Sequence, residues 1–132
     1  MKINLRRAAT LQEQIRQAVS DVSIDSSNGG LIEKLTHLEE LESVLYSLRD
    51  KVGKANVDTG VSTLLTKRVQ LNNLIGRYEK LVRKGEDEFQ AKLSDLRKER
   101  VTISEKILEL NVSSTVDLTD TDEQILAREN IL

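Results

Sequence analysis

The chain contains no cysteine, no proline and no tryptophan, and its only histidine is His37. Without cysteine it can form neither a disulfide nor a thiol-based active site. Zinc sites in proteins usually draw on several His or Cys ligands, so we expect no zinc site, and we expect His37 to lie on a helix surface without a specific role. The absence of proline is typical of long helices, because an interior proline breaks the helical hydrogen bonding.

Aromatic residues make up only 2% of the chain, whereas charged residues make up 32%. A compact globular core usually uses more aromatic bulk, but aliphatic contacts between long helices do not need it. The formal net charge of −2 argues against a general nucleic-acid binder. No apolar run approaches the ~20 residues that span a bilayer, and the first residues lack the apolar stretch of a signal peptide. We therefore expect a cytoplasmic protein that does not insert into membranes.

Leucine, isoleucine and valine recur at steps of three and four along most of the chain. This spacing places one apolar stripe along a helix, and the stripe needs another helix to cover it. The sequence therefore predicts an all-α fold of long antiparallel helical hairpins with coiled-coil-like packing. The clearest stripe consists of Leu31, Leu35, Leu38, Leu41, Leu45, Leu48 and Val52.

The stripes predict four helices in a bundle domain over residues 1–111. Clusters of turn-forming residues predict loops at 23–30 and 53–60. Gly85 is compatible with two structures, since it can end one helix before a reversal or be tolerated inside a continuous helix. We favour the reversal. The four predicted helices cover residues 4–22, 31–51, 61–84 and 86–111.

Residues 112–132 differ from the rest and are predicted to form a separate acidic tail with a short helix. Thr121 could cap that helix, with Gln124 completing a capping box. The tail is either unstructured or a docking peptide for a partner. Its acidic residues lack the glycine and the final glutamate of a calcium-binding loop, so we expect solvated charges and neither metal nor cofactor. The candidate partner-binding residues are Asp120, Asp122, Glu123, Ile125 and Leu126.

Two arginines, Arg68 and Arg100, occupy positions where the stripes predict aliphatic residues. If the chain reverses at Gly85, the two arginines come close together. One interpretation is an anion-binding notch, or a buried charge network that fixes the helix register. The alternative is that Val69 and Val101 occupy the apolar seam and the arginines reach water from its edge. The candidate network consists of Arg68, Glu99, Arg100 and Glu105.

Residues 51–84 carry eight Lys or Arg against two Asp or Glu. Three of these basic residues, Arg77, Lys80 and Lys84, share one helix face and could contact phosphates. Aromatic residues that would stack on single-stranded bases are scarce. We therefore expect this face to be balanced by the acidic helix at 31–51 or by another subunit.

Four segments occur in an order that resembles the small bacterial septicolysin-like proteins: LRDKVGKAN at 48–56, TLLTKRVQL at 63–71, LRKE at 96–99 and KILELN at 106–111. The shared features are a basic segment with an asparagine, a T-L-L-x-x-R helix start, and a last long helix that ends near an asparagine. The family name suggests a cytolysin. The resemblance implies an oligomeric, non-catalytic helical protein.

The sequence contains no glycine-rich phosphate loop, no Ser/His/Asp set and no pair of carboxylates that can be assigned to a cleft, so we expect no enzymatic activity. Four stripes on so few residues leave a thin core, and we expect copies of the chain to cover each other's apolar surface. The predicted function is a self-associating helical protein-interaction or regulatory protein, such as a small phage or bacterial inhibitor or adaptor. The alternatives are a membrane-active, cytolysin-like protein and a nucleic-acid-associated protein that uses residues 51–84.

Overall fold

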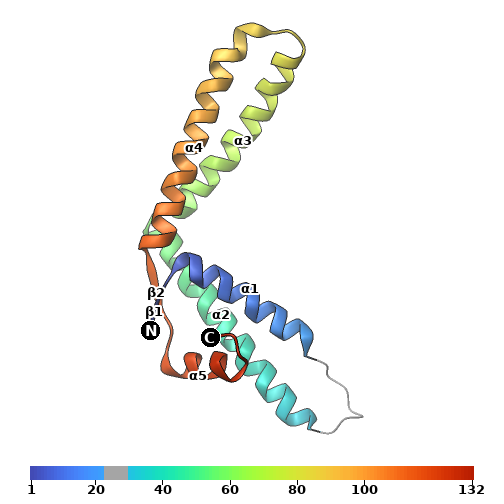
Figure 1. Cartoon of the computed structure of the whole chain (residues 1–132), viewed down its shortest axis with the longest axis vertical. Helices are drawn as coiled ribbons and strands as arrows, with labels where there is room; N and C mark the ends of the chain where they lie inside the picture. The colour runs from blue at the N-terminus through green and yellow to red at the C-terminus, as the bar shows by residue number, and fades with distance from the viewer. Residues whose placement is uncertain (23–29) are drawn as a thin grey trace. The chain divides into compact units, whose positions relative to one another are not determined.

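The computed structural model describes residues 1–22 and 30–132. These residues form two compact units, one made of 1–55 with 112–132 and the other of 56–111. The predicted all-α class is confirmed, and the loop predicted at 23–30 lies almost wholly outside the described residues. The α-helices, drawn in Figure 1, are α1 Leu5–Asp21, α2 Leu31–Asp58, α3 Val61–Arg83, α4 Gln90–Ser113 and α5 Asp120–Arg128.

The first unit is built on α1 and α2, whose apolar stripes face each other. Asn4 caps α1, because its side-chain oxygen accepts a hydrogen bond from the backbone N–H of Arg7 at 2.7 Å. The stripes predicted for these two helices are confirmed at their centres. The buried apolar residues from α1 and α2 are Leu5, Ala8, Leu11, Ile15, Leu41, Val44, Leu45 and Leu48.

The first unit also contains a two-stranded antiparallel sheet, which the sequence did not predict and which joins residues 2–4 to residues 115–117. Strand β1 (Lys2–Asn4) pairs with β2 (Thr115–Asp117), and Ile3 lies opposite Val116. Both of these side chains are buried in the same core as α1 and α2. Residues 112–132, which the sequence predicts to be a separate acidic tail, therefore pack into one unit with residues 1–55.

The loop predicted at 53–60 is wrong, because α2 continues through Gly53 to Asp58. A glycine inside a helix costs about 1 kcal/mol, which neighbouring contacts can offset. Val52 and Ala55 pack against the buried core on either side of Gly53. The chain turns only at Thr59 and Gly60, where Gly60 has a φ of 83° and precedes α3 directly.

The second unit contains the hairpin of α3 and α4. The predicted reversal at Gly85 is confirmed: its φ is 89°, and its N–H donates to the carbonyl of Val82 at 3.0 Å. The next N–H, of Glu86, donates to the carbonyl of Leu81 at 3.1 Å, which completes a Schellman motif. A short 3-10 turn, η2 (Asp87–Phe89), leads into α4. The buried seam consists of Val61, Leu71, Ile75, Leu93, Leu96, Ile103 and Ile107.

Candidate functional site

Helix α5 begins two residues earlier than the sequence predicts. Its cap is Thr119, whose hydroxyl accepts from the N–H of Asp122 at 3.1 Å, while the Asp122 carboxylate accepts from the N–H of Thr119 at 3.3 Å. The capping box predicted for Thr121 and Gln124 is therefore wrong. The physical reason is that a carboxylate three residues after a threonine closes the box as a Glu or Gln does, and Asp122 stands in that position.

The structure uses most of the predicted partner-binding residues within the first unit. Leu126 is 0% exposed and belongs to the core, and Ile125 packs against that core. Glu123 lies 3.7 Å from the N-terminal amino nitrogen, and Asp122 belongs to the cap. Of these five residues, Asp120 belongs neither to the cap, nor to the core, nor to that ion pair. It is exposed in the first turn of α5.

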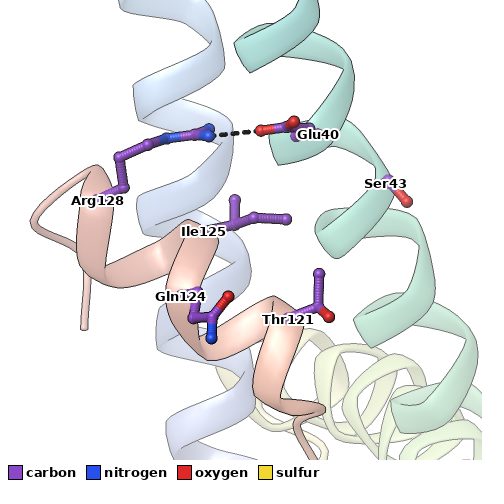
Figure 2. Close-up of a pocket in the computed structure, with 6 residues that line it drawn as sticks. All are labelled: Glu40, Ser43, Thr121, Gln124, Ile125 and Arg128. Carbon is purple, nitrogen blue, oxygen red and sulfur yellow. Dashed lines mark hydrogen bonds and ion pairs between the residues drawn. The ribbon is translucent and has the colours of Figure 1, made fainter.

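A shallow cleft of about 500 Å³ lies between α2 and α5 in the first unit. Figure 2 shows that Arg128 reaches across from α5 to Glu40 on α2, where the two form an ion pair. The hydrogen bond to Glu40 raises the pKa of the Arg128 guanidinium above its usual value. The other polar groups in the lining are the hydroxyls of Ser43 and Thr121 and the amide of Gln124. These groups could form hydrogen bonds with a polar ligand or peptide. It is lined by Glu40, Ser43, Thr121, Gln124, Ile125 and Arg128.

In the second unit, the two arginines that interrupt the stripes stay beside the seam. Arg68 and Arg100 are half-buried, whereas Val69 is 60% and Val101 54% exposed. The alternative in which the two valines occupy the seam is therefore wrong. Intermediate burial is usual for arginine, because its long aliphatic stem can cover apolar surface while the charged end stays in water.

The predicted charge network does not form between its four members. Arg100 Nη1 donates to the Asn72 side-chain oxygen at 3.2 Å, and Glu99 pairs with Lys67 at 3.2 Å. Glu105 is exposed on α4. Within residues 1–22 and 30–132, no ion pair links any two of the four predicted residues. Two residues of α3 therefore take the place of the predicted partners, Asn72 for Arg100 and Lys67 for Glu99.

Aliphatic side chains also lie outside the seam of this hairpin. Val69, Val101 and Leu108 are 60%, 54% and 53% exposed, and Leu65, which is half-buried and packs against the seam, borders them. On α3 the two residues are four positions apart, and on α4 they are seven apart, so each pair forms a stripe along its helix. We call this surface the hairpin face, and it consists of Leu65, Val69, Val101 and Leu108.

Bonds across the seam show that both stripes lie on one side of the hairpin. The hydrogen bond from Arg100 to Asn72 joins α4 and α3 on one side, at 3.2 Å. The ion pair of Lys67 with Glu99, also at 3.2 Å, joins them on the other side. Since the two helices run antiparallel (Figure 1), helical periodicity turns both exposed valines toward the side of the Arg100–Asn72 bond.

The sequence prediction missed the hairpin face, although a signal was present. From the sequence, Val69 and Val101 are considered only as seam residues that could stand in place of the two arginines. Leu108 had no assignment, yet it follows Val101 by seven residues, a spacing that repeats one helix face.

A basic surface lies on the outer side of α3 and at its end. Arg77, Lys80 and Lys84 are exposed, and in the part of the chain that the structure describes none of the three has an ion-pair partner. Arg83, by contrast, lies 3.7 Å from Glu79, which also pairs with Arg97 at 3.2 Å. The expected balance of this face by the acidic helix at 31–51 or by another subunit stays a prediction.

The described residues contain no cluster of three His, Asp or Glu side chains arranged to hold a metal ion. None of the described helices combines the length and the apolar character needed to cross a membrane. In comparisons with known proteins, no protein family, no curated protein and no solved structure matches the chain.

Proposed function

We propose that this chain is a non-enzymatic helical interaction protein that associates with copies of itself and binds another protein, as an adaptor or a protein inhibitor does. The proposal keeps the cytoplasmic location expected from the sequence. The observation that carries it is the hairpin face, where three of four aliphatic side chains are more than half exposed. Large apolar side chains gathered on one face of a soluble domain usually mark a contact with another protein.

Covering this face would contribute free energy to association. Full burial of a Val or Leu side chain contributes about 1.5–3 kcal/mol. Val69, Val101 and Leu108 are each between 53% and 60% exposed, so covering all three contributes about 2–5 kcal/mol per copy. The hairpin itself buries only one seam of seven residues, which leaves a thin core that a neighbour would thicken.

Two matched double variants test the proposal. In Val69→Glu/Val101→Glu, charges enter the hairpin face, whereas in Gln70→Glu/Thr102→Glu the same charges enter at neighbouring positions that point to the other side. We expect the first variant to be a monomer by light scattering, and the second to keep the mass of the unmodified assembly. Circular dichroism should show the same helix content for both variants. Equal masses for the two variants would contradict the proposal.

For the binding of a second protein, we propose the cleft between α2 and α5. The lining offers hydroxyl, amide and charged groups, and the exposed Asp120 lies in the same short helix. Capture experiments with the unmodified chain, with Arg128→Ala and with Ser43→Arg locate the contact. We expect both substitutions to reduce capture of the same partner while leaving self-association unchanged. Undiminished capture by both would remove the cleft from the proposal.

One observation favours a different candidate function, which is binding of nucleic acid. Arg77, Lys80 and Lys84 are exposed together without acidic partners among the described residues, and such a surface attracts phosphates. If this surface binds nucleic acid, a mobility shift should weaken steeply as salt rises, and Arg77→Gln/Lys80→Gln should abolish it. An absent or salt-insensitive shift would exclude this candidate. The cytolysin-like activity suggested by the septicolysin-like resemblance stays a prediction, for which liposome leakage is the test.

A further inference from the structure

Two opposite charges on the outer side of α4 lie on either side of Val101, at distances that differ by one residue, or about 1.5 Å along the helix. Lys98 precedes it by three residues and Glu105 follows it by four. Both side chains are exposed, and neither has an ion-pair partner in the described parts of the chain. The two are separated by about 10 Å along the helix, which is too far for them to pair with each other.

An apolar and a small residue also lie on either side of Val101. Leu108 follows Val101 by seven residues and projects from the face, whereas the exposed Ser94 precedes Val101 by seven and leaves room. A two-fold axis at Val101, perpendicular to the helix, would bring Leu108 of each copy over Ser94 of the other. The same axis would bring Lys98 of each copy to Glu105 of the other.

Helix α3 supports an axis at this level. The pairs Arg100–Asn72 and Lys67–Glu99 place Val69 at the same level along the hairpin as Val101, so an axis perpendicular to both helices at that level passes both valines. Seven residues from Val69 lie Gly76 on one side and Ser62 on the other. A Cβ built at Gly76 meets nothing within 4 Å, so packing inside the chain does not require glycine there.

From this arrangement we infer that a second copy of the chain docks on the hairpin face in antiparallel orientation. Helix α4 lies against α4 of the second copy with Val101 at the two-fold axis, and α3 lies against α3. Gly76 then faces Ser62 of the second copy, where two small residues let the helices approach closely. The inference rests on the proposed self-association and adds its geometry.

A parallel arrangement of the two hairpins would not pair Lys98 of one copy with Glu105 of the other. Its two-fold axis would run along the helices and place α4 over α3 of the second copy. Lys98 and Glu105 would then lie at the levels of Asn72 and Leu65. Both charges would lose part of their hydration without gaining a partner, which is unfavourable. Charge complementarity therefore selects the antiparallel arrangement.

Single cysteines test the geometry directly, because the chain has none of its own. A disulfide needs Cβ atoms about 3.5–4.5 Å apart, so only residues that meet across the axis can be linked. Under mild oxidation we expect Val101→Cys to form a covalent dimer, and Leu108→Cys alone to stay unlinked. A mixture of Leu108→Cys with Ser94→Cys should give the mixed dimer. Thr102→Cys, which points to the other side of α4, is the control and should stay unlinked.

A charge exchange gives a second measurement without cysteines. Lys98→Glu places two like-charged pairs across the axis, and we expect the dimer dissociation constant to rise about three- to tenfold. Lys98→Glu/Glu105→Lys restores opposite charges and should return the constant to within about twofold of the unmodified value. A merely structural role of either residue would not produce this rescue.

The outcomes separate the geometry from the proposed function. Linkage of Leu108→Cys to itself, or of Val101→Cys to Val69→Cys but not to Val101→Cys, would overturn the antiparallel geometry while the chain still self-associates. A lack of rescue in the exchanged-charge variant would also overturn it. A chain that is monomeric by light scattering and forms none of these links would refute the self-association itself.

Discussion

Replacing Leu126 by alanine should destabilise the first unit strongly, although the residue lies only six positions before Leu132. Leu126 is 0% exposed and belongs to the buried cluster formed by α1, α2 and the β1–β2 sheet. Removing a buried leucine side chain of this kind costs about 2–5 kcal/mol, from lost burial and from the cavity that remains. The exposed Gln124 in the same helix is the control, and Gln124→Ala should change stability by less than about 0.5 kcal/mol.

Hydrogen exchange of backbone amides, followed by mass spectrometry, measures this effect within the first unit alone. We expect amides of α5 and of α1 to exchange faster in Leu126→Ala, by a factor that corresponds to about 2–5 kcal/mol. Amides of α3 and α4 should keep their unmodified rates, because the two units have separate cores. If α5 amides of the unmodified chain exchange as fast as those of a peptide, the packing of residues 112–132 into the first unit is refuted.

Three further substitutions test local features of the structure. Thr119→Ala removes the cap of α5 and should cost about 1 kcal/mol in thermal or urea unfolding, whereas Thr121→Ala should cost almost nothing. Gly85→Ala should lower the stability of the hairpin by about 1 kcal/mol because φ is 89° there, whereas Gly53→Ala, inside α2, should raise stability by about 0.5–1 kcal/mol. Arg128→Ala removes an exposed ion pair to α2 and should cost less than about 1 kcal/mol, measured by urea unfolding in low and high salt.

The pH dependence of the last substitution follows from the sign of the pKa shift. The pKa of Arg128 is raised in the folded chain, so the stability it contributes is present below its unfolded pKa and is lost only as pH rises through the folded value. Both values lie in strongly basic solution, and the cost of Arg128→Ala should be constant between about pH 6 and 9. A cost that changes within this range would contradict the assignment.

The threonine and glycine substitutions each have a result that would contradict the structure. Equal losses from Thr119→Ala and Thr121→Ala would refute the position of the α5 cap. A stabilising Gly85→Ala would refute the left-handed turn between α3 and α4, and a destabilising Gly53→Ala would refute the unbroken course of α2.

The sequence predicted the helix stripes well because helical periodicity is a local property. Leu41, Leu45 and Leu48 are buried as their spacing indicated, and the reversal at Gly85 followed from the conformational preference of glycine. Gly53 carried the same local signal but lies inside α2. The difference comes from the packing of Val52 and Ala55, which is tertiary and cannot be derived from the local sequence.

The features that the sequence did not predict depend on contacts between distant segments. Strands β1 and β2 have three residues each, too few to show a period, and their partners lie at opposite ends of the chain. The burial of Leu126 follows from that pairing, since β2 leads directly into α5. At the hairpin face, the sequence shows two neighbouring candidates for the seam on each helix, Arg68 or Val69 and Arg100 or Val101. Which member of each pair faces the seam depends on how α3 packs against α4.

The mass of the unmodified chain in solution tests the central claim most directly. Sedimentation equilibrium over a dilution series should give an assembly of at least twice the 14.9 kDa chain at micromolar concentration, dissociating on dilution. A mass of 14.9 kDa at every concentration would show that the hairpin face stays uncovered by a second copy, and would contradict the account.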